Sequence, residues 1–335
     1  MIVKEAEEFD LAVRVLEAQG TPPAAAEMQA RVLVEADLRG QHSHGLQRLP
    51  TIVERITNGV IDPAGLPRKR WVSESFLEVD GARGLGPVVA FGVVDRLIER
   101  ADEVGFAVAA VHNNNHLGIL ACYVERIALA GQIGVAFTTS EALVHPWGGR
   151  KAMVGTNPVG MGVPTGGEPF LLDMATGAVS RGKILAFARA GRPLSLGWAL
   201  DVEGNPGTDA SLAIDGAISP FGGGKGYALG LGLELLVAAL TGSELGERVR
   251  GTLDTTSVCN KGDLFLVFSP EALGLTGIVD RVAAYLDEIR ASPPAPGAER
   301  IDVPGDRARR TRTERAAHGI PIDDSVWAAA ERLLP

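Results

Sequence analysis

The sequence predicts an α/β fold in which a helical N-terminal unit precedes a larger domain built on a mixed sheet. The first 60 or so residues place apolar side chains at helical spacing and contain no strand-like stretch. From about Trp71 onward, short apolar segments alternate with amphipathic ones in the order strand, helix, strand. The length of 335 residues is enough for about two domains of roughly 150 residues each.

Three helices are expected near the N-terminus. "EEFDLAVRVLEAQG" has helical periodicity and ends at Gly20, and "TPPAAAEMQARVLVEADLRG" offers Thr21 as N-cap and Gly40 as a stop. "PTIVERITNG" predicts a third, shorter helix. Between the second and third lies "RGQHSHGLQRLP", residues 39–50, which holds two of the six histidines of the chain. Because this segment is polar and follows a helix end, it is expected to be functional.

The central part of the chain alternates between strands and helices. Four segments have the apolar composition of strands, and three longer ones have that of helices. The expected strands are "SFLEVDG", "FAVAAV", "QIGVAFTTS" and "PFLLDMAT". The expected helices are "GPVVAFGVVDRLIERADEVG", closed by Gly105, then "LGILACYVERIALAG", and a buried "YALGLGLELLVAAL". Short links between them favour parallel pairing through right-handed crossovers.

The C-terminal part is different in composition. "ASPPAPGAERIDVPGDRARRTRTERAAHG" is rich in proline, glycine and charge, which predicts an extended surface segment. "DDSVWAAAERLL" predicts a terminal helix capped by Asp323, Asp324 or Ser325.

Composition limits the function classes. The net charge is −9 and the pI is about 5.3, which argues against nucleic acid or an anionic membrane as the main partner. The two cysteines, Cys122 and Cys259, are too few for a disulfide framework. No stretch resembles a signal peptide or is long and apolar enough to span a bilayer. A cytoplasmic enzyme is therefore expected.

Polar, glycine-rich turns follow three of the expected strands. "FAVAAV" leads into "HNNNHLG" at 112–118, "QIGVAFTTS" into "EALVHPWGGR", and "PFLLDMAT" into "GAVSRGK". In α/β units, functional residues gather at the C-terminal ends of strands. A histidine among asparagines is also an ordinary loop-capping residue, but the recurrence at successive strand ends favours a site. "GGGKG" at 222–226 is either a flexible turn or a backbone approach to phosphate or carboxylate, with Lys225 beside it.

Three function classes remain open from the residues alone. A P-loop NTPase is suggested by "GAVSRGKI", but Ile184 stands where Ser or Thr must bind magnesium. A metal enzyme would use the histidines, yet no HExxH motif or cysteine pair is present, so we expect no metal ligands. A hydride-transfer enzyme with histidine as acid and base fits the polar turns, but the Gly-x-Gly-x-x-Gly fingerprint is absent.

The motifs taken together resemble one family. "ADLRGQHSHGLQRLP", "HNNNHLG", "HPWGGRKAMVGTNPVGMGVP", "DMATGAVSRGK" and "PFGGGKGYALGLGLELL" occur in this order across nearly all of the chain. They are similar to the malate/L-lactate dehydrogenase family that is distinct from the Rossmann-type enzymes. That family includes ureidoglycolate, sulfolactate and diketogulonate dehydrogenases and reductases of cyclic imino acids. The resemblance explains the missing fingerprint, because the family binds its dinucleotide in a fold of its own.

The resemblance implies a non-Rossmann dehydrogenase fold. Residues 1–70 would form the helical unit, and the C-terminal segment 290–335 would return to join it. Residues 71–289 would form the α/β domain. It implies NAD or NADP as cofactor, a small 2-hydroxy or 2-oxo acid such as malate, lactate or sulfolactate as substrate, and a homodimer with the site near the interface. A cyclic imino acid reductase is the alternative.

The resemblance also implies site residues. The catalytic group would be Ser43, His44, Arg48 and His116. The cofactor would contact Ser140, Met174, Ala175, Thr176, Lys225 and the Pro304-Gly305-Asp306 segment. Asp306 stands where relatives usually have glutamate, and Gly177 and Ser180 stand where they often have serine and alanine. Glu141 falls on a variable point and is expected to influence specificity.

Elementary chemistry agrees with these roles. Histidine has an unperturbed pKa of about 6.5, which suits proton transfer near neutral pH while hydride moves to or from nicotinamide. Arginine can hold a substrate carboxylate with two parallel hydrogen bonds, which fits Arg48. We expect His116 to be the main acid/base, with His44 as the alternative. Ser43 would hold the reacting oxygen or orient His44, and Arg39 and His42 would be structural.

Overall fold

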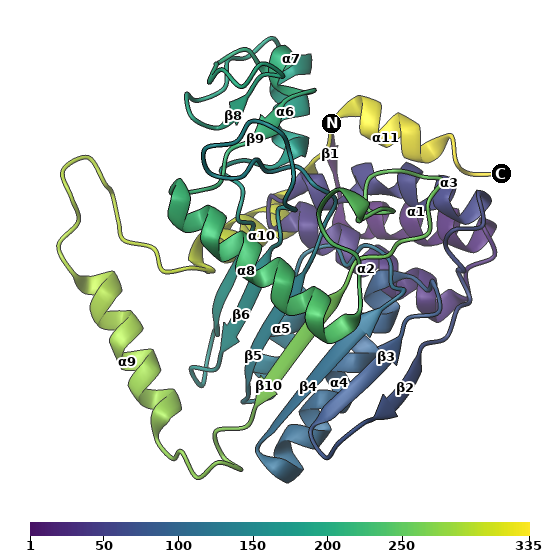
Figure 1. Ribbon diagram of the computed structural model, residues 1–335. Helices are drawn as coiled ribbons and strands as arrows, with labels where there is room; N and C mark the ends of the chain where they lie inside the picture. The colour runs from purple at the N-terminus through teal and green to yellow at the C-terminus, as the bar shows by residue number, and fades with distance from the viewer.

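A computed structural model describes all residues, 1–335, and its centre is a seven-stranded mixed sheet (Figure 1). The strand order is β2-β3-β4-β10-β5-β6-β7. The bounds are β2 (Arg68–Trp71), β3 (Phe76–Asp80), β4 (Phe106–His112), β5 (Ile133–Thr138), β6 (Val159–Val163), β7 (Phe170–Met174) and β10 (Asp263–Phe268). β3 and β4 are parallel, whereas β10, β5, β6 and β7 pair antiparallel in turn. β3, β4, β5 and β7 therefore point the same way, and their C-terminal ends lie at one edge of the sheet.

The sheet confirms part of the expected pairing and corrects the rest. β3 and β4 are joined in parallel, as predicted. β4 and β5 are not neighbours, because β10 inserts between them and pairs antiparallel with both. Strand order along the chain could not reveal an insertion from so distant a segment. β6 was not expected either, since "VGMGV" has the glycine content of a loop.

Helices cover both faces of the sheet. α4 (Gly86–Val104) and α5 (Ala121–Leu129) pack on one face, and α8 (Gly224–Thr241) lies across the other (Figure 1). Gly105 ends α4 with a φ of +90°, a backbone conformation that side chains with a Cβ rarely adopt. Behind the sheet, side chains such as Val93, Leu97 and Phe265 are fully buried in the main core. This rigid layer fixes the strand ends that carry the polar turns.

α8 is not the buried helix that its sequence predicted. Its inner face, with Gly230, Glu234 and Val237, packs on the body of the protein. Its outer face is also apolar, and Leu229, Leu235, Leu236 and Leu240 are between 42% and 50% exposed. Because the helix is hydrophobic all round, the sequence could not show that only one side is covered within a single chain.

The N-terminal helices match the prediction closely. They are α1 (Glu5–Ala18), α2 (Pro23–Leu38) and α3 (Leu49–Thr57). Gly20 and Gly40 follow the first two helices with φ of +80° and +79°, which is the glycine stop that was expected. Thr21 is not the N-cap of α2, because the helix begins after Pro22.

The end of the chain returns to these helices. β1 (Ile2–Val3) pairs with β11 (Ile320–Pro321), and α11 (Asp324–Glu331) packs on α1 and α3. Asp323 caps α11 by accepting a hydrogen bond from the Ser325 amide at 2.8 Å, as one of the expected caps. Val3, Leu16, Leu33 and Ile320 share one buried core.

The prediction of an extended segment before α11 is wrong for residues 306–318, because they form helix α10 (Asp306–His318). Its sequence has no apolar stripe and five arginines, so periodicity gave no helix signal. Ion pairs hold it instead: Arg312 pairs with Glu35 of α2 at 2.7 Å and Arg310 with Asp302 at 2.6 Å.

Two further parts complete the fold. A small unit with its own core contains α6 (Arg181–Arg189), β8 (Ala199–Leu200), α7 (Ala210–Ala213) and β9 (Ala217–Ile218). α9 (Ile278–Ala291) stands apart from the sheet (Figure 1), and only Leu286 of it is buried. Three short 3-10 turns are η1 (His42–His44), η2 (Leu46–Arg48) and η3 (Gly246–Arg248). None of the helices has the length and apolarity needed to cross a membrane.

Candidate active site

The turn that carries Ser43 and His44 is fixed by a buried carboxylate. Asp37 lies in the last turn of α2, with Oδ1 2.5 Å from His42 Nδ1 and Oδ2 accepting the Leu46 amide at 2.6 Å. A Cβ placed on Gly45 would lie 1.9 Å from Asp37 Oδ2, so only glycine allows this approach. Asp37 thus holds the turn on both sides of Ser43 and His44. Asp37 was not among the expected site residues, although a carboxylate at a helix C-terminus opposes the helix dipole and so indicates another role.

The asparagines of "HNNNHLG" tie neighbouring segments together at the C-terminal end of β4. Asn113 donates to Asp80 at 2.8 Å, and Asn114 donates to Asp263 at 2.9 Å, so β3, β4 and β10 are joined at one point. Asn115 donates to the carbonyls of Arg83 and Gly84, both at 2.8 Å. These hydrogen bonds have a structural role, and they are of the kind that loop-capping residues make. Their effect is to fix the backbone that presents the next residue, His116.

The structure brings His44 and His116 together. Their rings are stacked, with centroids 5.3 Å apart and planes 23° from parallel. Ser43 Oγ lies 3.0 Å from His44 Nδ1. The Gly118 amide donates to His116 Nδ1 at 3.1 Å. In the neutral state His116 therefore carries its proton on Nε2, whereas the Ser43 hydroxyl can either donate to His44 or accept from it.

Both histidines are held in the neutral form. Burial and the nearby Arg48 guanidinium lower the pKa of His44 to about 4. Burial, Arg48 and His44 hold the pKa of His116 well below its ordinary range. An added proton on His116 Nδ1 would also face the Gly118 N–H, which opposes protonation further. At neutral pH the pair can act as base or hydrogen-bond donor without carrying charge.

Two arginines beside the histidines lack carboxylate partners. Arg48 donates to the Thr252 carbonyl at 2.8 Å, and its buried Nε has no hydrogen-bond partner. Arg55 donates to Asn115 Oδ1 at 3.0 Å and to the Asp254 carbonyl. Burial and the nearby Arg55 lower the pKa of Arg48. A buried guanidinium that meets only neutral acceptors is suited to receive an anion.

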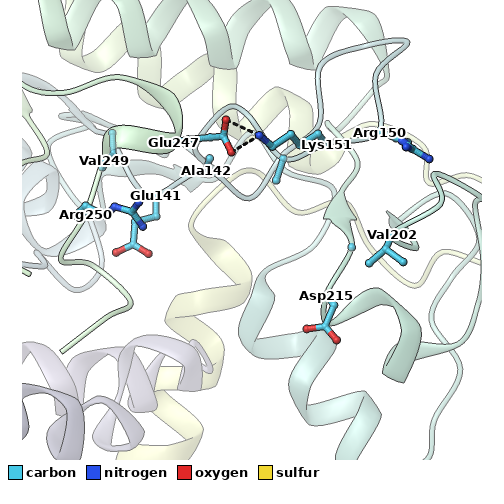
Figure 2. Close-up of a pocket in the computed structure, with 11 residues that line it drawn as sticks. Glu141, Ala142, Arg150, Lys151, Val202, Asp215, Glu247, Val249 and Arg250 are labelled. Atoms are coloured by element: carbon cyan, nitrogen blue, oxygen red, sulfur yellow. Dashed lines mark hydrogen bonds and ion pairs between the residues drawn. The ribbon is translucent and has the colours of Figure 1, made fainter. Parts of the chain in front are cut away.

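Arg48 and His116 line a small cavity, and a larger cleft lies next to it. The small cavity also has Asn115, Gly251 and Thr252 in its wall. The cleft has a volume of about 530 Å³ and is lined largely by charged residues: Glu141, Arg150, Lys151, Asp215, Glu247 and Arg250. In Figure 2, Glu141 and Arg250 lie on one side of it and Asp215 and Val202 on the other. Residues 247, 249 and 250 line the cleft, and residues 251 and 252 of the same segment line the small cavity, so the two hollows adjoin along this segment. This segment carries no motif and was not expected at the site.

Five of the residues that the resemblance assigned to the cofactor lie close to one another. Thr176 Oγ1 donates to the Thr156 carbonyl at 2.9 Å, and Ser140 Oγ lies 3.2 Å from Thr156 Oγ1. Met174 and Ala175 lead into Thr176 from the end of β7. The Phe221 amide donates to the Thr176 carbonyl at 3.0 Å, which brings in the start of α8 and Lys225.

The start of α8 has the properties of an anion site. Gly222 and Gly223 have φ of +58° and +66°, and a Cβ on Gly222 would meet no atom within 4 Å. Eighteen residues of helix follow, with the exposed Lys225 in the first turn. Free amides at a helix N-terminus together with a lysine fit the phosphates of a dinucleotide.

Pro304, Gly305 and Asp306 lie elsewhere, at the opposite end of β7. The Leu171 amide donates to the Pro304 carbonyl at 3.4 Å. The Asp306 carboxylate is occupied by Arg290 at 2.9 Å and Arg309 at 2.6 Å, which lower the pKa of Asp306 to about 2 against the opposing effect of burial. Within this chain it is therefore an ion-paired residue at the start of α10.

The structure does not bring together the residues that a metal enzyme or a P-loop NTPase would need. No three His, Cys, Asp or Glu side chains converge in a way that could hold a metal ion. In the P-loop-like segment, Ser180 caps α6 and Ile184 is buried in the small unit, where it cannot bind magnesium.

Comparison with known proteins agrees with the motif order. The family model described as malate/L-lactate dehydrogenase matches residues 3–330. A solved dehydrogenase from Sinorhizobium meliloti has a TM-score of 0.96 and 45% identity, covering 100% of this chain and 98% of that one. The (2R)-3-sulfolactate dehydrogenase (NADP(+)) of Chromohalobacter salexigens is 36% identical over 93% of this chain and 92% of its own. Delta(1)-pyrroline-2-carboxylate reductase 1 of Burkholderia ambifaria is 34% identical over 97% and 95%.

These similarities extend over almost the whole length of each protein, and the family and the relatives are dehydrogenases and reductases. They confirm the resemblance drawn from the motifs and the non-Rossmann α/β fold that it implied. The chain is an oxidoreductase and belongs to the malate/L-lactate dehydrogenase family.

Proposed function

We propose that the protein transfers a hydride between NAD or NADP and a small 2-hydroxy or 2-oxo acid, a class that includes malate, lactate and sulfolactate. One observation carries the proposal. Two neutral histidines, His44 and His116, are stacked at the edge of the sheet, and His116 lines a small cavity together with Arg48, which has no carboxylate partner. This is the set of groups that binding a carboxylate and moving a hydroxyl proton requires.

In the proposed mechanism, Arg48 binds the substrate carboxylate and so orients the reacting carbon. The buried Nε and the remaining N–H groups of its guanidinium can donate to the two carboxylate oxygens. Asn115 and Thr252 line the same cavity. The dinucleotide, when bound, gives or accepts the hydride. The protein then has to move one proton at the substrate oxygen.

We assign this proton to His44, although the sequence pointed first to His116. The Gly118 amide occupies His116 Nδ1, so Nε2 of the neutral ring is a donor and cannot accept a proton. His44 is not restricted in this way, because Ser43 can accept a proton from Nδ1 and leave Nε2 free as a base. His116 would then donate its Nε2 hydrogen to the same substrate oxygen and stabilise developing negative charge there.

The dinucleotide would be held by Ser140, by Met174, Ala175 and Thr176, and by Lys225. The anion-binding start of α8 supports the placement of its phosphates there. Pro304, Gly305 and Asp306 would contact a more distant part of the same molecule along β7, the edge strand of the sheet.

Reduction of a cyclic imino acid is the second candidate. Such a substrate also presents one carboxylate to Arg48 and receives a hydride at the adjacent carbon. The similarity to the Burkholderia ambifaria reductase supports this alternative.

We further propose that the protein works in the cytoplasm without nucleic acid or membrane partners. We propose that residues 1–70 and 290–335 form one unit of the chain and residues 71–289 the other. We also propose that the protein is a homodimer. The exposed leucines of α8 and the isolated α9, with Tyr285 63% exposed, supply the apolar surface that a second copy would cover. Light scattering of the purified protein measures this state directly.

Substrate screening tests the function. Purified protein is assayed with NADH and NADPH against pyruvate, oxaloacetate, sulfopyruvate and Δ1-pyrroline-2-carboxylate, before and after dialysis against a strong chelator. The proposal requires cofactor-dependent reduction of at least one of them, unchanged by dialysis. Absence of turnover with all of them contradicts it, and activity lost with a stoichiometric metal favours the metal enzyme.

The pH dependence of the reaction should follow the lowered pKa of His44. A base with a pKa of about 4 stays neutral as the pH falls through 6.5. We therefore expect kcat/KM for oxidation of the 2-hydroxy acid to stay level through 6.5 and to fall only as the pH approaches 4. Circular dichroism at each pH controls for unfolding. An acid limb centred at 6.5 would contradict the assignment.

His116→Ala should lower kcat by roughly 10²–10³-fold, the usual effect of removing a donor to a developing oxyanion. His116→Gln keeps a side-chain N–H and should recover part of this loss. Steady-state kinetics of both variants at saturating cofactor measures the difference. If Gln is no better than Ala and added imidazole restores turnover, His116 transfers the proton, as the sequence first suggested.

A further inference from the structure

We propose that Glu141 selects the charge of the substrate: it favours a substrate with one carboxylate and an uncharged or cationic far end, and it disfavours a second anionic group. The inference rests on the proposed function and concerns the same site. It narrows the substrate class to monoanions, such as pyruvate or a cyclic imino acid, against dianions such as oxaloacetate or sulfopyruvate.

The first observation is the place of Glu141 relative to the substrate-binding arginine. Glu141 Oε1 accepts the amides of Thr252 and Leu253, each at 2.8 Å. Arg48 donates to the carbonyl of the same Thr252 at 2.8 Å. The carboxylate and the guanidinium therefore flank one residue. A substrate whose carboxylate is on Arg48 and whose far end points toward the cleft therefore extends toward Glu141.

The second observation is that the cleft has room for that far end. It encloses about 530 Å³ and has Glu141 in its wall at the point where residues 247–252 pass from the cleft to the small cavity. The residues proposed to hold the cofactor, Ser140, Met174–Thr176, Lys225 and Pro304–Asp306, are not among those that line it.

The third observation is that the other charges of the cleft do not neutralise Glu141. Lys151 is paired with Glu247 at 2.7 Å, and Arg150 donates to the Glu203 carbonyl at 3.1 Å. Asp215 and Arg250 are exposed at the rim, whereas Glu141 is partly buried. Water screens exposed charges far more than buried ones. Of the charged residues that line the cleft, Glu141 alone is partly buried, so its negative charge is the one least screened by water.

Coulomb's law gives the size of the effect. Two like charges about 7 Å apart at an effective dielectric constant of 20 to 40 change a binding constant by roughly ten- to fiftyfold. This is large enough to decide between pyruvate and oxaloacetate, which differ only by the second carboxylate.

Glu141→Gln isolates the charge. The glutamine oxygen can still accept both amides, so the 252–253 segment keeps its anchor. In the unaltered protein we expect kcat/KM to be higher for pyruvate or Δ1-pyrroline-2-carboxylate than for oxaloacetate and sulfopyruvate. Glu141→Gln should raise kcat/KM for the two dianions about tenfold and leave the monoanions within about twofold. Glu271→Gln, which removes the same charge from an exposed side chain outside the cleft and the small cavity, is the matched control and should change neither.

The outcomes separate the two proposals. A preference of the unaltered protein for dianions overturns the inference and needs no variant, and so does a Glu141→Gln protein that changes all four substrates equally. Failure of all four substrates with both cofactors would instead reject the proposed function. Activity with at least one substrate keeps the function and leaves only the charge selection to be judged.

Discussion

His44→Ala should lower kcat by roughly 10²–10⁴-fold, the usual contribution of a positioned acid/base. His44 is the ring whose Nε2 is free to exchange a proton, because Ser43 Oγ, 3.0 Å from Nδ1, can accept as well as donate. Its pKa of about 4 keeps it unprotonated at neutral pH, as a base for alcohol oxidation must be. Removing it takes away the proton acceptor and leaves Arg48 in place. KM should therefore change much less than kcat.

Kinetics and cofactor titration on one preparation test this expectation. Dinucleotide affinity, followed by fluorescence, should be unchanged, and added imidazole should restore part of the turnover. His42→Gln is the matched control in the same turn, since glutamine keeps a donor toward Asp37. An equal loss in His42→Gln would mean that the turn, and not the His44 ring, is responsible. Normal turnover of His44→Ala together with a large loss in His116→Ala would return the acid/base role to His116.

The parts of this site that sequence reasoning identified are those with local causes. Glycine stops at Gly20, Gly40 and Gly105 need only the φ that each helix end demands. The rule that functional residues follow strands placed His116 at the end of β4 without knowledge of the sheet order, because β3, β4, β5 and β7 end on the same edge whichever strands lie between them. His44 was predicted as a site residue because it lies in a polar segment, residues 39–50, whose few apolar side chains do not predict a core element.

The parts that remained hidden depend on contacts between distant residues. Asp37 acts through His42 and Leu46; its place at a helix C-terminus indicates that it has another role, but not that it binds the loop that follows. Thr252 contacts Arg48 across 204 positions of the chain. α10 is held by ion pairs to α2 and has no apolar stripe to reveal it. Hydrophobic periodicity reports burial, so it cannot report elements and contacts that are held by charge.

The stacked histidines show that a motif predicts which residues lie at the site but not the tautomer of each ring. Both rings were expected from the motifs, with His116 ranked first because it follows a strand end. The reverse ranking comes from one backbone amide: Gly118 N–H meets His116 Nδ1 and fixes which nitrogen of that ring carries the proton. A resemblance carries residue identities over, but the tautomer is a property of the local hydrogen bonds.

Arg48→Lys should raise KM and also lower kcat, each by about tenfold or more. Lysine keeps the positive charge but cannot form two parallel hydrogen bonds to a carboxylate. Binding is weakened, and the reacting carbon is held less firmly against the cofactor, so the chemical step slows as well. The buried Nε of Arg48, which has no partner in the chain, is the observation behind this expectation.

The alternative is that Arg48 is structural and only anchors the 251–257 segment through Thr252. In that case Arg48→Lys would lower the melting temperature and leave kcat/KM unchanged. Arg39→Lys is the reference for such behaviour, because Arg39 is buried between Glu35 at 3.1 Å and Glu125 at 2.5 Å and touches no part of the cavity. Kinetics and thermal unfolding of both variants, measured side by side, distinguish the two roles. A reduced kcat/KM in Arg48→Lys with a melting temperature closer to the unaltered protein than that of Arg39→Lys assigns Arg48 to the substrate carboxylate, and unchanged kcat/KM excludes it.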